Sequence, residues 1–505
     1  MVDLRRRRRP GPTAGAPGWA TAQVIAWALC WLPGCGTNGT SGFDHRTVQD
    51  PEACQGCHPQ HYLEWAGSMH AYAGDDPVFR AMNRRAQRED PATGTFCVQC
   101  HAPVAAREGL TRDGLNLDDL PASKRGVTCY FCHATASLPS GQLHNDPLVL
   151  ATDGSLFGPI ADPDRQMPHQ GRYSALLDGA TVASATMCGS CHDIQNLQGA
   201  HVERTFREWK TTVFAGTKGG SGCAQCHMPG RDGPASAVTA RVRRVHSHAF
   251  PAVDLAAIPF PAESPQNDAQ RAGAQELLDR SLQSTWCLNP LTNRIELTLD
   301  NIGAGHSFPS GATPDRRLWI EVTASAGGQV IYSSGGAQAL PLEGSPDPDL
   351  WLIRDCLYDA GGGEVKMFWQ PATTLTNALP GTLPPNVADP CSYSVSHVKR
   401  VYPDPASSPP LAQAPDRVTI QVHLRAIGAD VLDDLVGSGD LDAAVPAGIA
   451  QYDVGGGAAV DWNASASAAP TCFSSTASTN STVPAVSHAR CTPPPAAPTC
   501  AAPGT

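Results

Sequence analysis

The pattern of apolar and polar positions divides the chain into two halves, and the second half predicts β-strands. Apolar residues alternate with polar residues in four segments, which cover residues 294–303, 316–325, 329–334 and 417–424. Such alternation is typical of strands that bury one face and expose the other, and Gly- and Pro-rich turns separate these segments. We therefore predict an all-β, sandwich-like domain over residues 286–428.

Three further segments belong to this half. The apolar run at 349–369 carries a few charges and predicts a pair of core strands rather than a binding site. A helical pattern over residues 268–283 predicts a helix that joins the two halves, within a connecting segment at 266–285. Beyond residue 428 the composition turns to Ala, Ser, Pro and Gly, so we expect residues 429–505 to form a loose, disordered, low-complexity tail.

The first half predicts only short helices between Gly-, Pro- and Asp-rich loops. Helical patterns cover residues 59–68, 76–87 and 205–214. In the second of these, Asp76 is placed to cap the helix and Pro77 to occupy its first turn.

A basic run and a short apolar stretch at the N-terminus predict export. Arg5 to Arg9 precede an apolar stretch at 19–32, which is short for a membrane-spanning helix and suits a secretory signal over residues 1–34. The stretch ends in Leu-Pro-Gly-Cys, which resembles a bacterial lipoprotein box with Cys35 as the lipidated first residue of the mature chain. Ordinary cleavage and an uncleaved anchor are the alternatives. Residues 35–49 would then form a linker.

The charge of the chain limits its partners. The 505 residues carry a formal net charge of −11, and loss of residues 1–34 removes five arginines and one aspartate and leaves −15. A surface this acidic argues against nucleic acid as a partner and favours cationic or neutral partners.

Ten of the 18 cysteines fall in five copies of one motif, C-x-x-C-H. Two thiols three residues apart can form thioethers with the two vinyl groups of one haem, and the histidine that follows binds the iron as its proximal ligand. Zinc or disulfides are the alternatives, but neither explains why a histidine follows every second cysteine. The sequence therefore predicts five covalent haem c groups, held by motif 1 (Cys54, Cys57, His58), motif 2 (Cys97, Cys100, His101), motif 3 (Cys129, Cys132, His133), motif 4 (Cys188, Cys191, His192) and motif 5 (Cys223, Cys226, His227).

The motifs lie between residues 54 and 227 and predict a pentahaem cytochrome c domain over residues 50–265. At about one haem per 35 residues the haems themselves form the core, and long strands have no room. Unequal intervals between the motifs rule out a strict repeat. Haems packed this closely lie within tunnelling distance of one another, so electron transfer is the expected consequence.

The residues around the motifs resemble multihaem c-type cytochromes related to the tetrahaem cytochrome of ammonia oxidisers. The likeness covers residues 50–430, and the segments that carry it are CQGCHPQHYLEWAGSMH, RGVTCYFCH, MCGSCHD, ERTFREW, GCAQCHMPG and HSHAFP. It implies a fold in which haem-packed short helices precede a β-sandwich domain.

This resemblance also implies which histidines bind the second axial position of each iron. It assigns His70 in the W-x-x-S-x-H run, His248 in the H-x-F-P run and His306 in the G-x-G-H-x-x-P-[ST]-G turn. His169, which follows a Gly-Pro-Ile-x-Asp-Pro segment, also fits. With these ligands the irons would be mostly bis-histidine ligated.

The sequence does not decide which histidine is the fifth distal ligand. His144 is our choice, with His201 and His61 as alternatives, and His246 competes locally with His248. Four further histidines are interpreted as structural: His45, His397, His423 and His488.

The turn at 301–311, NIGAGHSFPSG, predicts a link between the two halves. Gly303, Gly305 and Gly311 allow a tight approach of the backbone, and Pro309 stiffens it. We expect the β-domain to lend His306 to a haem of the preceding domain.

Six cysteines remain once the motif cysteines, Cys30 and Cys35 are set aside. An even number in an exported chain suggests disulfides, although the sequence does not define their connectivity. We favour Cys356–Cys391, and Cys491 and Cys500 could pin the tail; Cys287 and Cys472 complete the set.

These features predict an exported pentahaem c-type cytochrome, with no catalytic residue assigned. It would be a periplasmic, outer-membrane or cell-surface lipoprotein of a bacterium that carries electrons from a respiratory donor to a periplasmic or extracellular acceptor. One alternative is a multihaem reductase or oxidase of a small nitrogen or sulfur compound at one open haem. Against it, no motif has lysine in place of its histidine. Another alternative makes the β-domain an adhesion or docking module.

Overall fold

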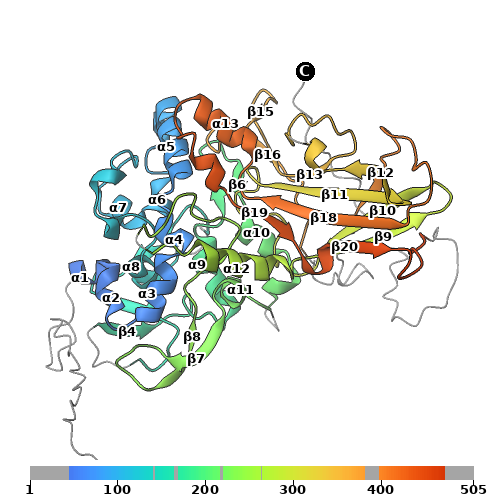
Figure 1. Cartoon of the computed structure of the whole chain (residues 1–505). Coiled ribbons are helices and arrows are strands. Elements are labelled where there is room, and N and C mark those ends of the chain that lie inside the picture. Colours follow the sequence, from blue (N-terminus) through green and yellow to red (C-terminus); the bar gives the residue numbers. More distant parts are fainter. Residues whose placement is uncertain are drawn as a thin grey trace, which may run out of the picture. The chain divides into compact units, whose positions relative to one another are not determined.

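The computed structural model describes residues 45–139, 141, 143–163, 169–216, 220–262, 264–339, 341–381 and 397–472. Over these residues, short helices and small sheets come first in the chain, and antiparallel sheets follow (Figure 1). The predicted fold class, a haem-packed region followed by an all-β domain, is confirmed. The predicted signal at 1–34 and Cys35 lie outside the described residues.

The first region consists of short elements. Its helices are α1 (His45–Gln49), α2 (Pro51–Gln55), α3 (Pro59–Ala66), α4 (Met69–Tyr72), α5 (Pro77–Glu89), α6 (Val98–His101), α7 (Pro103–Arg107), α8 (Cys129–His133), α9 (Ala185–Gly189), α10 (Thr205–Lys210) and α11 (Cys223–His227). Its strands form two-stranded sheets: β1 (Thr135–Ser137) with β2 (Val149–Leu150), β3 (Ser155–Gly158) with β4 (Gln170–Tyr173), β5 (Ile194–Gln195) with β6 (His201–Glu203), and β7 (Gly230–Pro234) with β8 (Val242–His246).

The predicted helices of this region form, and local chemistry sets their ends. Asp76 accepts a hydrogen bond from the backbone N–H of Val78 and so caps α5, as its sequence predicted. The pattern at 59–68 yields α3, and Ser68 then caps the next short helix, α4. The pattern at 205–214 yields α10, followed by a 3₁₀ turn at Val213–Ala215.

The second region is a β-sandwich preceded by helix α12 (Asn267–Leu278). Its first sheet orders β17 (Val398–Tyr402), β10 (Arg294–Asn301) and β9 (Leu282–Asn289). Its second sheet orders β12 (Gln329–Ser334), β11 (Arg317–Ala326), β18 (Arg417–Arg425) and β19 (Gln451–Val454), with β13 (Trp351–Ile353) also paired to β11 and β20 (Val460–Asn463) to β18. A small third sheet holds β14 (Cys356–Tyr358), β15 (Glu364–Val365) and β16 (Thr373–Leu375).

The alternation that predicted the strands buries one face of each sheet. Ile295, Leu297 and Leu299 of β10 share one apolar core with alternate residues of β11 and β18, such as Ile320 and Val422. The outward face is polar: His423 lies opposite Trp319 across the β11–β18 pair and bonds to acidic side chains. Its interpretation as a structural histidine therefore agrees with its surroundings.

Two predicted boundaries are wrong. The connecting helix ends at Leu278 rather than at 283, because residues from Leu282 onward pair with β10 as strand β9. The tail does not begin at 429: α13 (Ala429–Gly437), β19 and β20 fold back onto the structure, and Val431, Leu432 and Leu435 pack against α5. The rest of the predicted tail, from residue 473, lies outside the described residues. Segment 349–369 does supply strands, but β13 and β14 belong to different sheets.

One disulfide closes the sandwich. Cys287 of β9 bonds to Cys472, so the last described residue is tied to the first strand of the domain. Cys356 is also disulfide-bonded. Its predicted partner, Cys391, lies outside the described residues, as do Cys491 and Cys500, so those pairings stay predictions. None of the helices in the described part of the chain is both long and apolar enough to cross a membrane.

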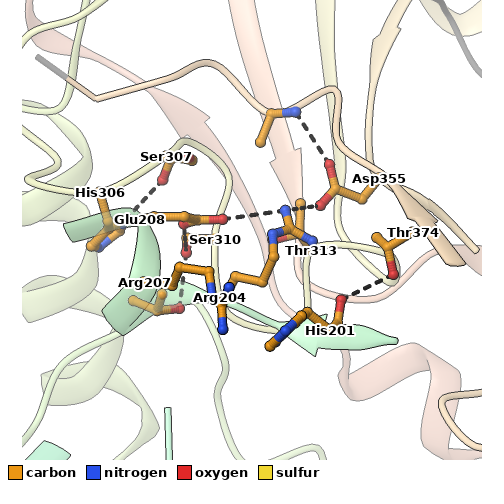
Figure 2. A network of polar contacts seen from close by, with 12 residues as sticks. His201, Arg204, Arg207, Glu208, His306, Ser307, Ser310, Thr313, Asp355 and Thr374 are labelled. Carbon is orange, nitrogen blue, oxygen red and sulfur yellow. Dashed lines mark hydrogen bonds and ion pairs between the residues drawn. The ribbon is translucent and has the colours of Figure 1, made fainter. Parts of the chain in front are cut away.

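A buried polar network joins helix α10 to the β-domain. Arg204, which precedes α10, pairs with Asp355, whose side chain is fully buried and also accepts the backbone N–H of Asn377. One turn further on, Glu208 accepts a hydrogen bond from Ser310 at 2.7 Å. Figure 2 shows Glu208 between Arg204 and Ser310, close to the turn that carries His306.

We expect Asp355→Asn to lower the free energy of unfolding by about 3 kcal/mol, because the buried Arg204 guanidinium loses its nearer counter-charge and keeps only Glu208, at 3.3 Å. The measurement is urea unfolding of the haem-loaded protein followed by circular dichroism. Arg417→Gln is the control, since Arg417 and Asp461 form an exposed pair that is worth about 1 kcal/mol or less. Equal losses in the two variants would contradict the structural role of the Arg204–Asp355 pair.

Candidate haem-binding site

A cavity of about 1930 Å³ lies among the elements of the first region, and every cysteine and histidine of the five motifs lines it. Its wall also contains apolar and aromatic side chains, among them Phe79, Phe131, Phe206 and Trp209. An apolar cavity of this kind, with thiols and imidazoles at its edge, is the environment that covalently bound porphyrins require.

Each motif forms about one turn of helix, which explains its spacing. In motif 1 the backbone N–H of His58 donates to the carbonyl of Cys54 at 2.8 Å, and motifs 2 and 4 repeat this bond at 3.2 and 3.0 Å. Helices α8 and α11 begin at the first cysteine of motifs 3 and 5 and end at the histidine. Residues three and four apart share a helix face, so both thiols and the imidazole of one motif turn toward the same space.

All five motif histidines are fixed through the same ring nitrogen. Nδ1 donates to a backbone carbonyl in four motifs and to a carboxylate in the fifth, which leaves Nε2 as the nitrogen available to a metal. The Nδ1 partners are Ala235 O for His58 (2.8 Å), Ala73 O for His101 (3.1 Å), Phe157 O for His133 (2.6 Å), Glu203 Oε1 for His192 (2.9 Å) and Pro251 O for His227 (2.9 Å).

Four of these histidines face a second imidazole across the cavity. A metal–imidazole bond is about 2 Å long, so two imidazoles on opposite faces of one iron hold their ring centres about 6 Å apart. The observed ring-centre distances are 6.3 Å for His58–His169, 6.2 Å for His133–His248, 6.3 Å for His192–His70 and 6.5 Å for His227–His306. The structure thus brings all four distal candidates implied by the resemblance opposite a motif histidine.

The fifth motif histidine has different surroundings. His101 stacks on Phe79 with ring centres 4.0 Å apart, and no other imidazole among the described residues contacts its ring. The structure places His144 off the cavity wall, in electrostatic contact with His201, which is also off the wall. The position of His144 therefore gives no support to its predicted role as fifth distal ligand.

Two further histidines, His61 and His246, line the cavity. The His61 ring centre lies 6.0 Å from that of His58 and 4.7 Å from that of His248, and the His61 ring is edge-on to both. His61 therefore competes with His169 for the position opposite His58. His246 binds the carbonyl of Met228 through Nδ1 at 2.7 Å. His248, rather than its neighbour His246, therefore faces His133.

Glycines shape the loop that carries His306. A Cβ on Gly303 would lie 2.2 Å from the carbonyl oxygen of Arg280, and Gly305 has a φ of +77°. Thr212 donates to the carbonyl of Gly305 at 3.2 Å, and Nδ1 of His306 donates to Ser307 O at 2.7 Å. The β-domain turn is thereby held against the end of α10 with the Nε2 side of His306 toward His227.

The cavity favours neutral imidazoles. Burial lowers the pKa of His70 and His248 to about 3 and that of His169 to about 4. Neutral imidazole is the form that binds a metal.

His192 is the exception, because burial is outweighed by Glu203, which raises the His192 pKa to about 9. For Glu203 itself, burial acts to raise the pKa, but the charges of His192 and Arg316 outweigh it and hold the pKa below its usual value.

The thiols connect the motifs to one another. Cys54 and Cys129 lie within hydrogen-bonding reach, which joins motifs 1 and 3. The pairs Cys100–Cys191 and Cys188–Cys223 join motif 4 to motifs 2 and 5 in the same way. Cys132 of motif 3 also interacts electrostatically with Cys191. No attachment point in the cavity is therefore isolated.

These observations fit haem better than zinc. Motif cysteines such as Cys54, Cys97 and Cys129 are thiols outside any disulfide, as thioether formation requires. Within the described residues, the only three His, Cys, Asp or Glu ligand atoms that gather closely enough to hold a metal ion belong to Cys287, Glu296 and Cys472, and two of these are in a disulfide. The motif residues thus supply paired thiols and single imidazoles around a large apolar space rather than a compact tetrahedral site.

Sequence reasoning missed the groups that orient the proximal histidines. Four are backbone carbonyls, which carry no residue identity and leave no signal in the sequence. The fifth, Glu203, lies in the ERTFREW segment, and only its position opposite His192 gives it a role.

Comparisons with known proteins agree with this geometry. Residues 53–134 match the family described as cytochrome c554 and c-prime. None of the curated proteins matches the chain. Among solved structures, the penta-heme cytochrome c552 from Thermochromatium tepidum is similar, with a TM-score of 0.54 and 20% identity over 82% of this chain and 98% of that one. The five motifs, the fold shared with the penta-heme cytochrome and the family match over residues 53–134 together support a multihaem c-type cytochrome.

Proposed function

We propose that this chain is an exported electron-transfer protein that holds five covalent haem c groups. The observation that carries the proposal is the contact between motifs: the thiols of motifs 1 and 3, 2 and 4, and 4 and 5 adjoin in pairs. Groups attached at adjoining thiols are close neighbours, and haem iron supplies a one-electron couple at each attachment point.

The proposed axial ligands are the facing imidazoles. His58 with His169, His133 with His248, His192 with His70 and His227 with His306 would each hold one iron from both sides. Such sites leave no axial position for a small molecule, which favours electron transfer over catalysis.

A second candidate function rests on motif 2. His101 faces no other imidazole among the described residues, so an iron bound there would keep one axial position without a histidine. This favours binding of a small nitrogen or sulfur compound at that one site, as in a multihaem reductase or oxidase. Electron transfer remains the better-supported function, because four of the five sites have facing histidines.

The setting we propose follows from the N-terminal sequence. Export by the signal at 1–34 would place the protein in the compartment where haem c is attached, and lipidation of Cys35 would anchor it to a membrane surface. A respiratory donor and a periplasmic or extracellular acceptor are the proposed partners, and the acidic charge makes nucleic acid an unsuitable one.

Replacement of His70, His169, His248 or His306 by Ala should each convert one low-spin haem to high-spin, because the iron loses one axial imidazole. Electron paramagnetic resonance and optical spectra of the oxidised protein measure the change. His144→Ala is the matched control and should leave the spectra unchanged. A new high-spin signal in that control, or none in the four variants, would contradict the proposed ligands.

The unmodified protein should show one high-spin haem among five, and cyanide should convert it to low-spin. The reason is the missing imidazole opposite His101. The same titration on His306→Ala should reveal two cyanide-binding haems. Five low-spin haems that do not respond to cyanide would refute the second candidate function and leave electron transfer in place.

A further inference from the structure

The Nδ1 partner of His192 differs in charge from those of the other four motif histidines. His58, His101, His133 and His227 donate to backbone carbonyls, whereas His192 donates to Oε1 of Glu203 at 2.9 Å. An amide carbonyl and a carboxylate are not equivalent acceptors, because the hydrogen bond to an anion is roughly twice as strong.

The local fold places Glu203 there. Directly after motif 4, β5 and β6 form a short antiparallel hairpin, and Glu203 at the end of β6 pairs with Ile194, two residues beyond His192. The backbone N–H of Phe206 then donates to the carbonyl of His192 at 2.9 Å. The Ile194–Glu203 pairing and the Phe206–His192 hydrogen bond bring the backbone on either side of Glu203 next to motif 4. These contacts hold the Glu203 side chain against the His192 ring.

Glu203 lies in an enclosed position near several haem attachment points. Its side chain is only 19% exposed. Its charge also acts on His101 of motif 2 and on His306, the partner of His227. The Arg316 guanidinium, whose charge also acts on Glu203, binds both oxygens of Asp254 at 2.6 Å and is thus already paired. Among the described residues, the ion-pair partner of this carboxylate is His192, so its negative charge acts on motif 4.

We propose that Glu203 is a positioning residue that lowers the reduction potential of the haem at motif 4 by making His192 a stronger electron donor to iron. A carboxylate that accepts the Nδ1 proton raises the basicity of Nε2, and a more basic ligand favours ferric over ferrous iron. In each transfer the iron held by His192 would pass one electron to the haem of an adjoining motif and go from ferrous to ferric, while the proton would stay on Nδ1. This inference rests on the proposed haem ligation by His192.

The position of motif 4 gives this effect a consequence for electron flow. Its thiols adjoin those of motifs 2 and 5 and interact with Cys132 of motif 3. Electrons that pass from motifs 1 and 3 to motifs 2 or 5 by way of adjoining attachment points must cross motif 4. A lowered potential at that junction raises the free energy of an electron at motif 4, and Glu203 thereby slows exchange between the two sides.

The test is Glu203→Gln, which supplies an amide oxygen like the acceptors of the other four motifs. We expect the reduction equilibrium of the motif 4 haem to shift at least tenfold toward the ferrous form, which is about 59 mV for one electron. We expect smaller changes in the reduction potentials of the haems at motifs 2 and 5. Spectroelectrochemical titration of the purified holoprotein measures the potentials, and a His70→Ala background marks motif 4 by its high-spin spectrum.

Two further variants separate charge from hydrogen bond. Glu203→Asp keeps the charge but withdraws the carboxylate from Nδ1. We therefore expect the reduction potential of the motif 4 haem to lie between those of the unmodified protein and Glu203→Gln. This variant also tests the proposal if Glu203→Gln fails to fold. Glu52→Gln removes an exposed carboxylate two residues before Cys54. It should change the reduction potential of every haem less than Glu203→Gln changes that of the motif 4 haem. The proposal would be overturned if the reduction potential of the motif 4 haem changed no more in the Glu203 variants than in Glu52→Gln. Five haems that still reduce reversibly would then leave the proposed electron transfer standing.

Discussion

An imidazole whose Nδ1 is held by a hydrogen bond can offer only Nε2 to a metal, and the whole first region of this protein depends on that constraint. Each C-x-x-C-H motif forms one helical turn, which turns two thiols and an imidazole to one side. The carbonyl or carboxylate that receives Nδ1–H comes from elsewhere in the chain: Ala235 for His58 and Pro251 for His227. The loops between motifs therefore orient the ligands, even though they contain little regular structure.

The β-domain is part of the same site. It contributes His306 from the turn after β10, and the contacts of Thr212, Glu208 and Ser310 hold that turn against α10. The Arg204–Asp355 pair beneath them is buried, and such pairs stabilise little by themselves but are costly to break. The effect of this pair is geometric, because it fixes the position of the His306 turn relative to helix α10.

The same cavity gives the motif histidines two kinds of surroundings. Four motif histidines face a second imidazole, and His101 packs on Phe79. Among the four, His192 alone donates to a carboxylate. Identical motifs thus acquire different chemical surroundings from residues outside them, which is how one protein can hold the same cofactor at different potentials.

The sequence determined what depends on near neighbours. The motif spacing matches one helical turn, Asp76 caps its own helix, and alternation predicted β10, β11, β12 and β18, because each of these follows from chemistry within a few residues. It misjudged residues 429–472, where a composition rich in small residues hid α13, β19 and β20. Those short elements are stable because they pack on α5 and β18, and a local pattern does not show such partners.

Only the tertiary structure decided which distant residues meet. His169 faces His58 and His248 faces His133 across long stretches of chain, while His144, equally plausible as a ligand by residue type, lies off the cavity wall. Glu203 lies in the ERTFREW segment, but only the tertiary structure places its carboxylate against Nδ1 of His192. The physical reason is that axial ligation and hydrogen bonding depend on distances of a few ångströms in space, which separation along the sequence does not determine.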